Sequence, residues 1–188
     1  EENNLFFDLL EKQTDNKNWI VRKSVAFALG KTNNKLSYEL LMTMLAQEND
    51  TIVDAQIIKS IGQLPDKNKV IPTLISFTKF EDFSDIALDV LADLGKDIIP
   101  FIQKELNNQD SEVRINLVSV LSKIEDDKSI LLLTKLASED SSPNVRKHAI
   151  LSLSKFIHTQ KAIWAVMWVA NHDSDIYVRQ SAKDLLVP

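Results

Sequence analysis

The sequence predicts an all-α solenoid, a stack of about six helix pairs, and three observations support that fold class. A stretch of eleven residues, clearest as VRINLVSVLSK from Val113, recurs in copies that begin at Val21, Val53, Ile86, Val145 and Val178. Apolar residues occupy the first, fifth and ninth positions of every copy, which is the stripe of a helix buried on one side. The copies start 27 to 33 residues apart, a period typical of stacked helical units.

Each recurring helix, called B here, follows a second apolar stretch, called A. We expect the A helices at residues 5–12, at 38–47, near Pro72, near Pro100, at 128–138 and at 161–171, and one B helix over each copy. Asn18 and Ser37 are polar residues placed to cap the helices that follow them. Ser142 and Pro143 form a cap and first-turn pair for the fifth B helix.

Prolines and glycines mark the expected helix ends. Pro72 and Pro100 stand in the similar contexts VIPTLISF and IIPFIQKEL, and we predict that both lie in the first turn of an A helix, where no intrahelical amide bond is lost. The three glycines of the chain, Gly30, Gly62 and Gly95, all occupy the tenth position of their copies. We predict that each ends a B helix in the left-handed conformation.

Composition narrows the class of protein. The chain of 188 residues is 44% hydrophobic and 26% charged, which is the balance of a globular protein. The absence of cysteine excludes a disulfide framework, a thiolate nucleophile and a cysteine metal site, and we expect an intracellular, cytoplasmic protein. The longest apolar run, residues 162–170, is far shorter than the roughly 20 residues that cross a bilayer. A net charge of −5 argues against a wholly electrostatic nucleic-acid binder.

The spacing of the copies predicts one solenoid domain over residues 1–188. The expected repeats cover residues 1–33, 34–65, 66–96, 97–126, 127–158 and 159–188. The chain starts at Glu1 without a methionine, and its last residues carry no polar capping unit. We therefore expect a fragment of a longer protein.

The order of an A helix with an early Ile-Pro, a short turn, and Asp-x-x-Val-Arg before an apolar B helix resembles HEAT repeats, especially the compact type of phycobilisome-lyase-like proteins. The full signature appears at Asp110 with Arg114 and at Asp175 with Arg179. The resemblance covers essentially the whole chain and implies a right-handed superhelix of the ARM/HEAT type.

The resemblance also implies that the aspartates and arginines pair along the stack. We interpret these residues as a structural ladder: Arg22, Asp110, Arg114, Arg146, Asp175 and Arg179. A row of arginines can also bind an anion, but here each belongs to the stacking pattern. The third unit has neither signature residue, so we expect the superhelix to bend or loosen there.

By the same resemblance the B helices line the concave surface, and the chain is predicted to be a noncatalytic scaffold that binds another protein, one that carries acidic segments, on that face. The predicted contact residues are Lys31, Lys59, Lys96, Lys123, Lys155, Phe27, His148 and Leu151. A simpler explanation of the lysines is that cations near a helix C-terminus favour the macrodipole by about 0.3 to 1 kcal/mol. Phe27 and Leu151 favour a protein partner, because apolar residues on a solvent-facing row suit one.

The run AIWAVMWVA around Trp164 and Trp168 is apolar all round, whereas an outer solenoid helix should show a polar face. Packing of both tryptophans in the core is one explanation. A further repeat, a dimer contact or a partner site are the others. We favour a further repeat of a longer solenoid, and an end-to-end contact through Trp164, Trp168 and the C-terminal helix is the second expectation.

Nothing in the pattern predicts a catalytic residue, a cofactor or a metal. The histidines at 148, 158 and 172 lie on separate segments, away from any nucleophile motif or metal-ligand spacing, and three glycines at helix ends supply no phosphate loop. Resemblance alone leaves two alternatives. One is a phycobilisome-lyase-like enzyme that acts on bilins, and the other is a HEAT-like DNA glycosylase or related nucleic-acid-binding protein, against which the acidic charge argues.

Overall fold

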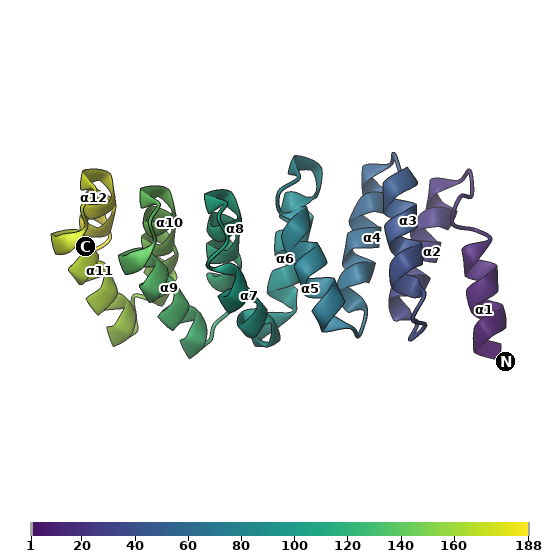
Figure 1. The fold of residues 1–188 in the computed structure, drawn as a ribbon, viewed down its shortest axis with the longest axis horizontal. Helices are drawn as coiled ribbons and strands as arrows, with labels where there is room; N and C mark the ends of the chain where they lie inside the picture. Colours follow the sequence, from purple (N-terminus) through teal and green to yellow (C-terminus); the bar gives the residue numbers. More distant parts are fainter. Residues whose placement is uncertain (1, 188) are drawn as a thin grey trace. The chain divides into compact units, whose positions relative to one another are not determined.

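A computed structural model describes residues 2–187, with side chains from Leu5 onward. Glu1 and Pro188, the ends of the first and last expected repeats, lie outside the described residues. Within residues 2–187 the chain forms twelve α-helices, two short 3-10 helices and no β-strand, so the predicted all-α solenoid class is confirmed (Figure 1). The chain divides into two compact units, Glu1–Leu91 (unit 1) and Ala92–Pro188 (unit 2).

Unit 1 contains three A helices and three B helices. The A helices are α1 (Glu2–Glu11), α3 (Ser37–Gln47) and α5 (Lys67–Phe77), and the B helices are α2 (Trp19–Lys31), α4 (Thr51–Gln63) and α6 (Glu81–Asp93), whose last two residues belong to unit 2. The predicted stripe is buried in α4, where Val53, Ile57 and Ile61 have no exposed surface. These side chains form the middle of the core of unit 1.

Unit 2 repeats the same order. After the 3-10 helix η1 (Gly95–Ile98) follow α7 (Ile99–Glu105), α8 (Ser111–Leu121), α9 (Asp127–Glu139), α10 (Pro143–Leu153), the 3-10 helix η2 (Ser154–Phe156), α11 (Gln160–His172) and α12 (Ile176–Asp184). The A helices α9 and α11 pack side by side, as do the B helices α8, α10 and α12 (Figure 1). Val113, Leu117 and Leu121 of α8 are fully buried, as the stripe predicts.

Helix caps follow the predictions in most turns. Asn18 precedes α2 and accepts the amide hydrogen of Ile20 at 2.9 Å, which confirms its predicted capping role. Ser37 does not cap α3, because it is the first residue of that helix and its buried hydroxyl bonds to Thr32 Oγ1 instead. Ser142 and Pro143 stand at the N-cap and the first position of α10 as predicted, but the Ser142 side chain makes no capping hydrogen bond.

The predictions for glycine and proline were right at one position of each kind. Gly95 has a φ of 65° and occupies the left-handed conformation. Gly30 and Gly62 lie inside α2 and α4, where they allow close helix packing: a Cβ atom on Gly30 would lie 2.7 Å from Ser60 Cβ. Pro100 lies in the first turn of α7. Pro72 lies in the middle of α5, because that helix already begins at Lys67.

None of the described helices has the length and apolar character that spanning a membrane requires.

Candidate functional site

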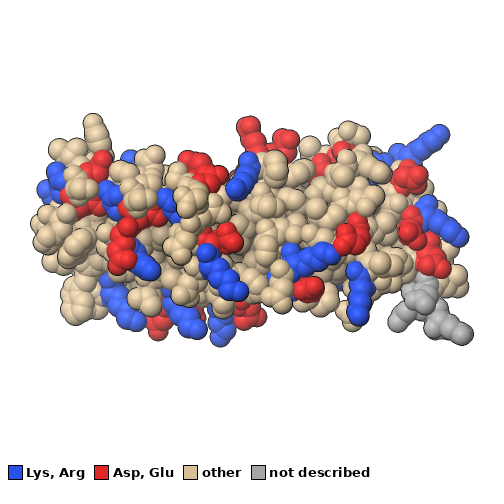
Figure 2. Space-filling view, in the orientation of Figure 1, with Lys and Arg blue, Asp and Glu red and all other residues tan. Residues whose placement is uncertain are grey.

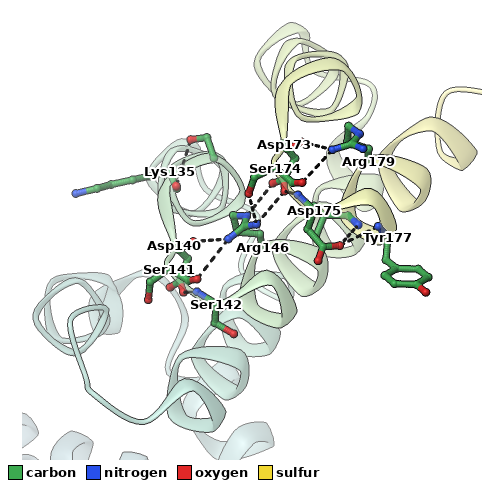
Figure 3. A network of polar contacts seen from close by, with 12 residues as sticks. Lys135, Asp140, Ser141, Ser142, Arg146, Asp173, Ser174, Asp175, Tyr177 and Arg179 are labelled. Atoms are coloured by element: carbon green, nitrogen blue, oxygen red, sulfur yellow. Dashed lines mark hydrogen bonds and ion pairs between the residues drawn. The ribbon is translucent and has the colours of Figure 1, made fainter.

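Arg146 of α10 connects two turns of unit 2. Its Nε and Nη2 donate to the two carboxylate oxygens of Asp173 at 2.7 and 2.9 Å, and its Nη1 donates to the backbone carbonyl of Asp140 at 2.8 Å (Figure 3). The side chains of Arg146 and Asp173 are 9% and 2% exposed. The guanidinium therefore joins the turn before its own B helix to the turn before the next one, in the bidentate geometry that suits arginine.

The same arrangement occurs at two more arginines. Arg114 donates from Nε and Nη2 to Asp140, at 2.8 Å each, and from Nη1 to the carbonyl of Asn108 at 2.6 Å. In unit 1, Arg22 donates in the same way to Glu48, at 2.7 Å each, and to the carbonyl of Asn16 at 2.8 Å. We call each such arginine with its carboxylate partner a rung.

The partner carboxylates are not the aspartates of the sequence signature. Asp110 and Asp175 cap their helices by accepting the amide hydrogens of Glu112 and Tyr177, at 3.0 and 2.8 Å. This corrects the expectation that those aspartates pair with the arginines along the stack. The signal that sequence reasoning missed is a second acid, two residues before the cap position.

The rung carboxylates also hold their own turns. Asp140 Oδ1 accepts from the amide of Ser142 at 2.8 Å, and Asp173 Oδ1 accepts from the amide of Asp175 at 2.8 Å. Glu48 Oε1 accepts from the amide of Asp50 at 3.1 Å. One acid therefore closes a turn and receives the arginine of the preceding repeat, which explains why the rungs recur at the same place.

The rungs shift the ionisation of their acids. The hydrogen bonds from Arg22 are the main cause that lowers the pKa of Glu48 to about 2, against the opposing effect of burial. Burial raises the pKa of Asp173, but the hydrogen bonds from Arg146 and from the turn amide outweigh it, so that the pKa lies below its ordinary value. Both carboxylates are therefore ionised at neutral pH.

Arg179 makes the backbone contacts of a rung, to the turn before its own helix. Its Nη1 donates to the carbonyls of Asp173 and Ser174 at 2.6 and 3.1 Å (Figure 3). All four ladder arginines thus fasten the turn before their own B helix. Figure 3 also shows Asp175 directed at the start of α12, where it accepts from Tyr177.

The predicted partner-binding residues are divided between the two units. In unit 1, Phe27 and Lys31 are exposed on α2, with Lys31 Nζ 5.5 Å from the centre of the Phe27 ring, and Lys59 is exposed on α4. In unit 2, Lys96 lies on η1 and Lys155 on η2.

Lys123 and Lys155 come together at one end of the unit 2 helices. They line an open cleft of about 670 Å³ with His158 and the acids Glu125, Asp126 and Asp127, and Lys155 Nζ donates to Ser122 Oγ at 3.3 Å. Figure 2 shows Lys and Arg side chains along this edge of unit 2, where the B helices end and the A helices begin. Charges of both signs meet in the cleft, so it is not a purely cationic groove.

His148 and Leu151 are exposed on α10. His148 Nδ1 lies 2.8 Å from the carbonyl oxygen of Asn144. A carbonyl can only accept, so this ring nitrogen carries a hydrogen and leaves Nε2 directed elsewhere. The histidine is therefore oriented by its own helix.

Three large apolar side chains of α9 and α11 line one exposed groove of unit 2. Trp164 is 64% exposed, Trp168 48% and Leu131 of α9 60%, so core packing does not account for the tryptophans. Together with Ala165, Thr134, Ser138 and the charged residues Lys161 and Glu139 they line a groove of about 520 Å³. We call this the tryptophan groove.

His172 holds Trp168 in place. The two rings stack with centres 5.1 Å apart and planes inclined by 20°, and His172 Nδ1 donates to the carbonyl of Trp168 at 2.9 Å. The indole is therefore fixed in an exposed position, which lowers the entropy lost when a partner covers it.

A metal centre is not formed by any group of three or more His, Cys, Asp or Glu side chains in the part of the chain that the structure describes.

Comparison with known proteins gives one family match. A family model described as HEAT repeats matches residues 99–186. No curated protein sequence matches the chain. The solved structure of human deoxyhypusine hydroxylase in complex with glycerol aligns with a TM-score of 0.46 at 13% sequence identity, over 96% of this chain and 83% of that chain.

Proposed function

We propose that this chain, whose residues 99–186 match a family model of HEAT repeats, is a noncatalytic scaffold that binds another protein. The observation that carries the proposal is the tryptophan groove, where Leu131, Trp164 and Trp168 are about half exposed or more on two adjacent A helices. Tryptophan is among the residues that contribute most to binding energy in protein interfaces. Large exposed apolar patches on soluble domains commonly mark such contacts.

The proposed occupant is an amphipathic helix of the partner. Two helices packed side by side, here α9 and α11, leave a shallow groove between them that suits the apolar stripe of a third helix. Its lining includes two tryptophans, a leucine and an alanine, and Lys161 and Glu139, which also line it, offer one charge of each sign to the polar side of the incoming helix. Apolar residues at positions i, i+3 or i+4, and i+7 of the partner would meet Leu131, Trp164 and Trp168.

The B-helix face remains a second proposed surface of the same scaffold. His148, Leu151 and Lys155 belong to α10 and η2, and all three are exposed. Leu151 is 44% exposed, less than Leu131 or Trp164. A single apolar side chain supports this surface less strongly than the three that line the tryptophan groove.

Site-directed photo-crosslinking in cells that make the protein tests the two surfaces against each other. A photoreactive phenylalanine analogue would replace Trp168 in one full-length variant, Leu151 in a second, and the exposed Leu36 of unit 1 in a control. We expect a discrete crosslinked protein from position 168 that is not obtained from position 36. The same product should disappear when Trp164→Ala and Leu131→Ala are added.

Crosslinks from position 151 alone would move the contact to the B-helix face. Crosslinks of equal pattern and intensity from positions 168 and 36 would contradict a specific partner site on either surface. Circular dichroism of each variant checks that the helices are intact. We expect them to be intact, because exposed side chains contribute little to folding.

A further inference from the structure

The second rung of unit 1 is replaced by an acid. The second residue of the recurring stretch is Arg22, Arg114, Arg146 or Arg179 in four copies, but in α4 it is Asp54. A carboxylate therefore stands where α2, α8, α10 and α12 place a guanidinium, whereas α6 has Ala87 at this position. The substitution reverses the charge at that junction.

Asp54 lies among groups that disfavour its charge. Its Oδ1 is buried and accepts no hydrogen bond. The charges that act on it come from three places: Glu48 in the turn before α4, Asp50 at the N-cap of α4, and Asp82 in the first turn of α6. All three are acids, and like charges close together raise the energy of the ionised state.

The basic groups near this junction are engaged or exposed. Arg22 of α2 is committed to Glu48 through two hydrogen bonds. Lys79 in the turn between α5 and α6 has an exposed side chain and a contact of its own. On α6, Asp85 adds a further exposed acid one turn after Asp82. The junction is thus acidic on each of the elements that supply it.

The opposite ends of the same two helices are in close contact. Gly62, near the end of α4, lies so close to α6 that an added Cβ would collide with Val90 Cγ1. Asp54 and Asp82 lie toward the starts of α4 and α6. Repulsion at the starts and tight contact near the ends is the geometry of a hinge.

We propose that the junction of α4 and α6 in unit 1 is a pH-sensitive hinge, which closes when Asp54 is protonated and loosens when it ionises. Burial, followed by repulsion from Glu48, Asp50 and Asp82, raises the pKa of Asp54 to about 6 from an ordinary 3.8. Asp54 of the closed junction therefore loses its proton between mildly acidic and neutral pH.

The sign follows from linkage. The folded junction binds the proton more tightly than the unfolded chain does, so its stability is complete below pH 3.8 and is lost as the pH rises through about 6. Between pH 5 and pH 7.5 the equilibrium constant for opening should increase by up to about tenfold. The rung acid Glu48 does not contribute there, because its pKa of about 2 keeps it ionised throughout.

Hydrogen exchange of the full chain tests the hinge. Amide protection of α4 and α6 would be measured from pH 5 to pH 7.5, corrected for the intrinsic exchange rates, in the natural chain, in Asp54→Asn and in the control Glu11→Gln, which changes an exposed acid of α1. We expect protection of the natural chain and of the control to fall by up to about tenfold as the pH rises. In Asp54→Asn it should stay at a constant, high level.

The same pH dependence in Asp54→Asn and in the natural chain would overturn the proposal, as would a natural chain whose protection does not change with pH. A second measurement covers the case in which Asp54→Asn fails to fold. The carboxyl ¹³C shift of Asp54 in the natural chain should titrate with a midpoint near 6. A midpoint near 4 would equally exclude the hinge.

Discussion

Unit 1 and unit 2 stack the same kind of helix pair by different means. Unit 2 joins its turns with two buried bidentate rungs, Arg114 with Asp140 and Arg146 with Asp173. Unit 1 has one rung, Arg22 with Glu48, and then Asp54 where the next arginine would stand. The apolar stripe thus makes the stack, whereas the polar residues of the turns decide how firmly each junction is held.

Glycine gives unit 1 a second means of stacking. Gly30 of α2 lies close to the backbone of Ser60 in α4, and Gly62 of α4 admits the side chain of Val90 from α6, so both junctions depend on the missing side chain of a glycine. The one glycine of unit 2, Gly95, has open space around it and serves a left-handed turn. Unit 1 therefore combines a single rung with close contacts at two glycines, whereas unit 2 has two rungs.

The largest effect in this comparison should come from cutting a unit 2 rung. Arg146→Ala leaves the carboxylate of Asp173 buried without its partner, and we expect a loss of about 3 to 5 kcal/mol in the free energy of unfolding. Urea unfolding measures it. The double variant Arg146→Met with Asp173→Leu should recover much of that loss, and a single variant that costs under about 1 kcal/mol would show that the rungs do not hold unit 2 together.

Acid should weaken the one rung of unit 1. Glu48 has its pKa lowered to about 2 from 4.5, so its contribution is present above pH 4.5 and is lost as the pH falls through 2. We expect a loss of about 1 to 3 kcal/mol at the α2–α4 junction between pH 5 and pH 2, seen as reduced amide protection of α2. In Glu48→Gln this part of the acid sensitivity should be absent, and its persistence would assign the effect to other acids.

A methyl group should disturb the close junctions of unit 1. Gly62→Ala places a Cβ against Val90, so we expect a loss of about 1 to 3 kcal/mol from overpacking, although alanine is itself the better helix former. Thermal unfolding measures the change. Gly30→Ala should act in the same direction through Ser60, and a rise in melting temperature for both variants would refute the role assigned to these glycines.

The smallest effect on stability should come from the tryptophan groove. Trp168→Ala removes a side chain that is 48% exposed, and we expect a change of under about 1 kcal/mol in the free energy of unfolding. The same variant should abolish partner binding through this groove, so stability and binding separate. A large loss of stability would mean that the indole belongs to the core of unit 2.

The candidate site was predictable in part. The arginines, the lysines and the exposed apolar residues could be identified because each occupies a constant position in a repeated helix. Their acid partners were missed, because Glu48, Asp140 and Asp173 lie 26 or 27 residues from the arginines they bind, and only the folded turns show what an acid two residues before the cap does. The raised pKa of Asp54 also depends on Asp82, which belongs to a different helix.

Local periodicity alone determined the helix pairs, the buried stripe and caps such as Asn18, because these depend on residues within one or two turns of each other. Only the tertiary structure decided that Gly30 and Gly62 admit a neighbouring helix, that Pro72 lies within α5, and that Trp164 and Trp168 face outward. Those outcomes depend on which helix packs against which. Contacts between repeats cannot be read from the periodicity within one repeat.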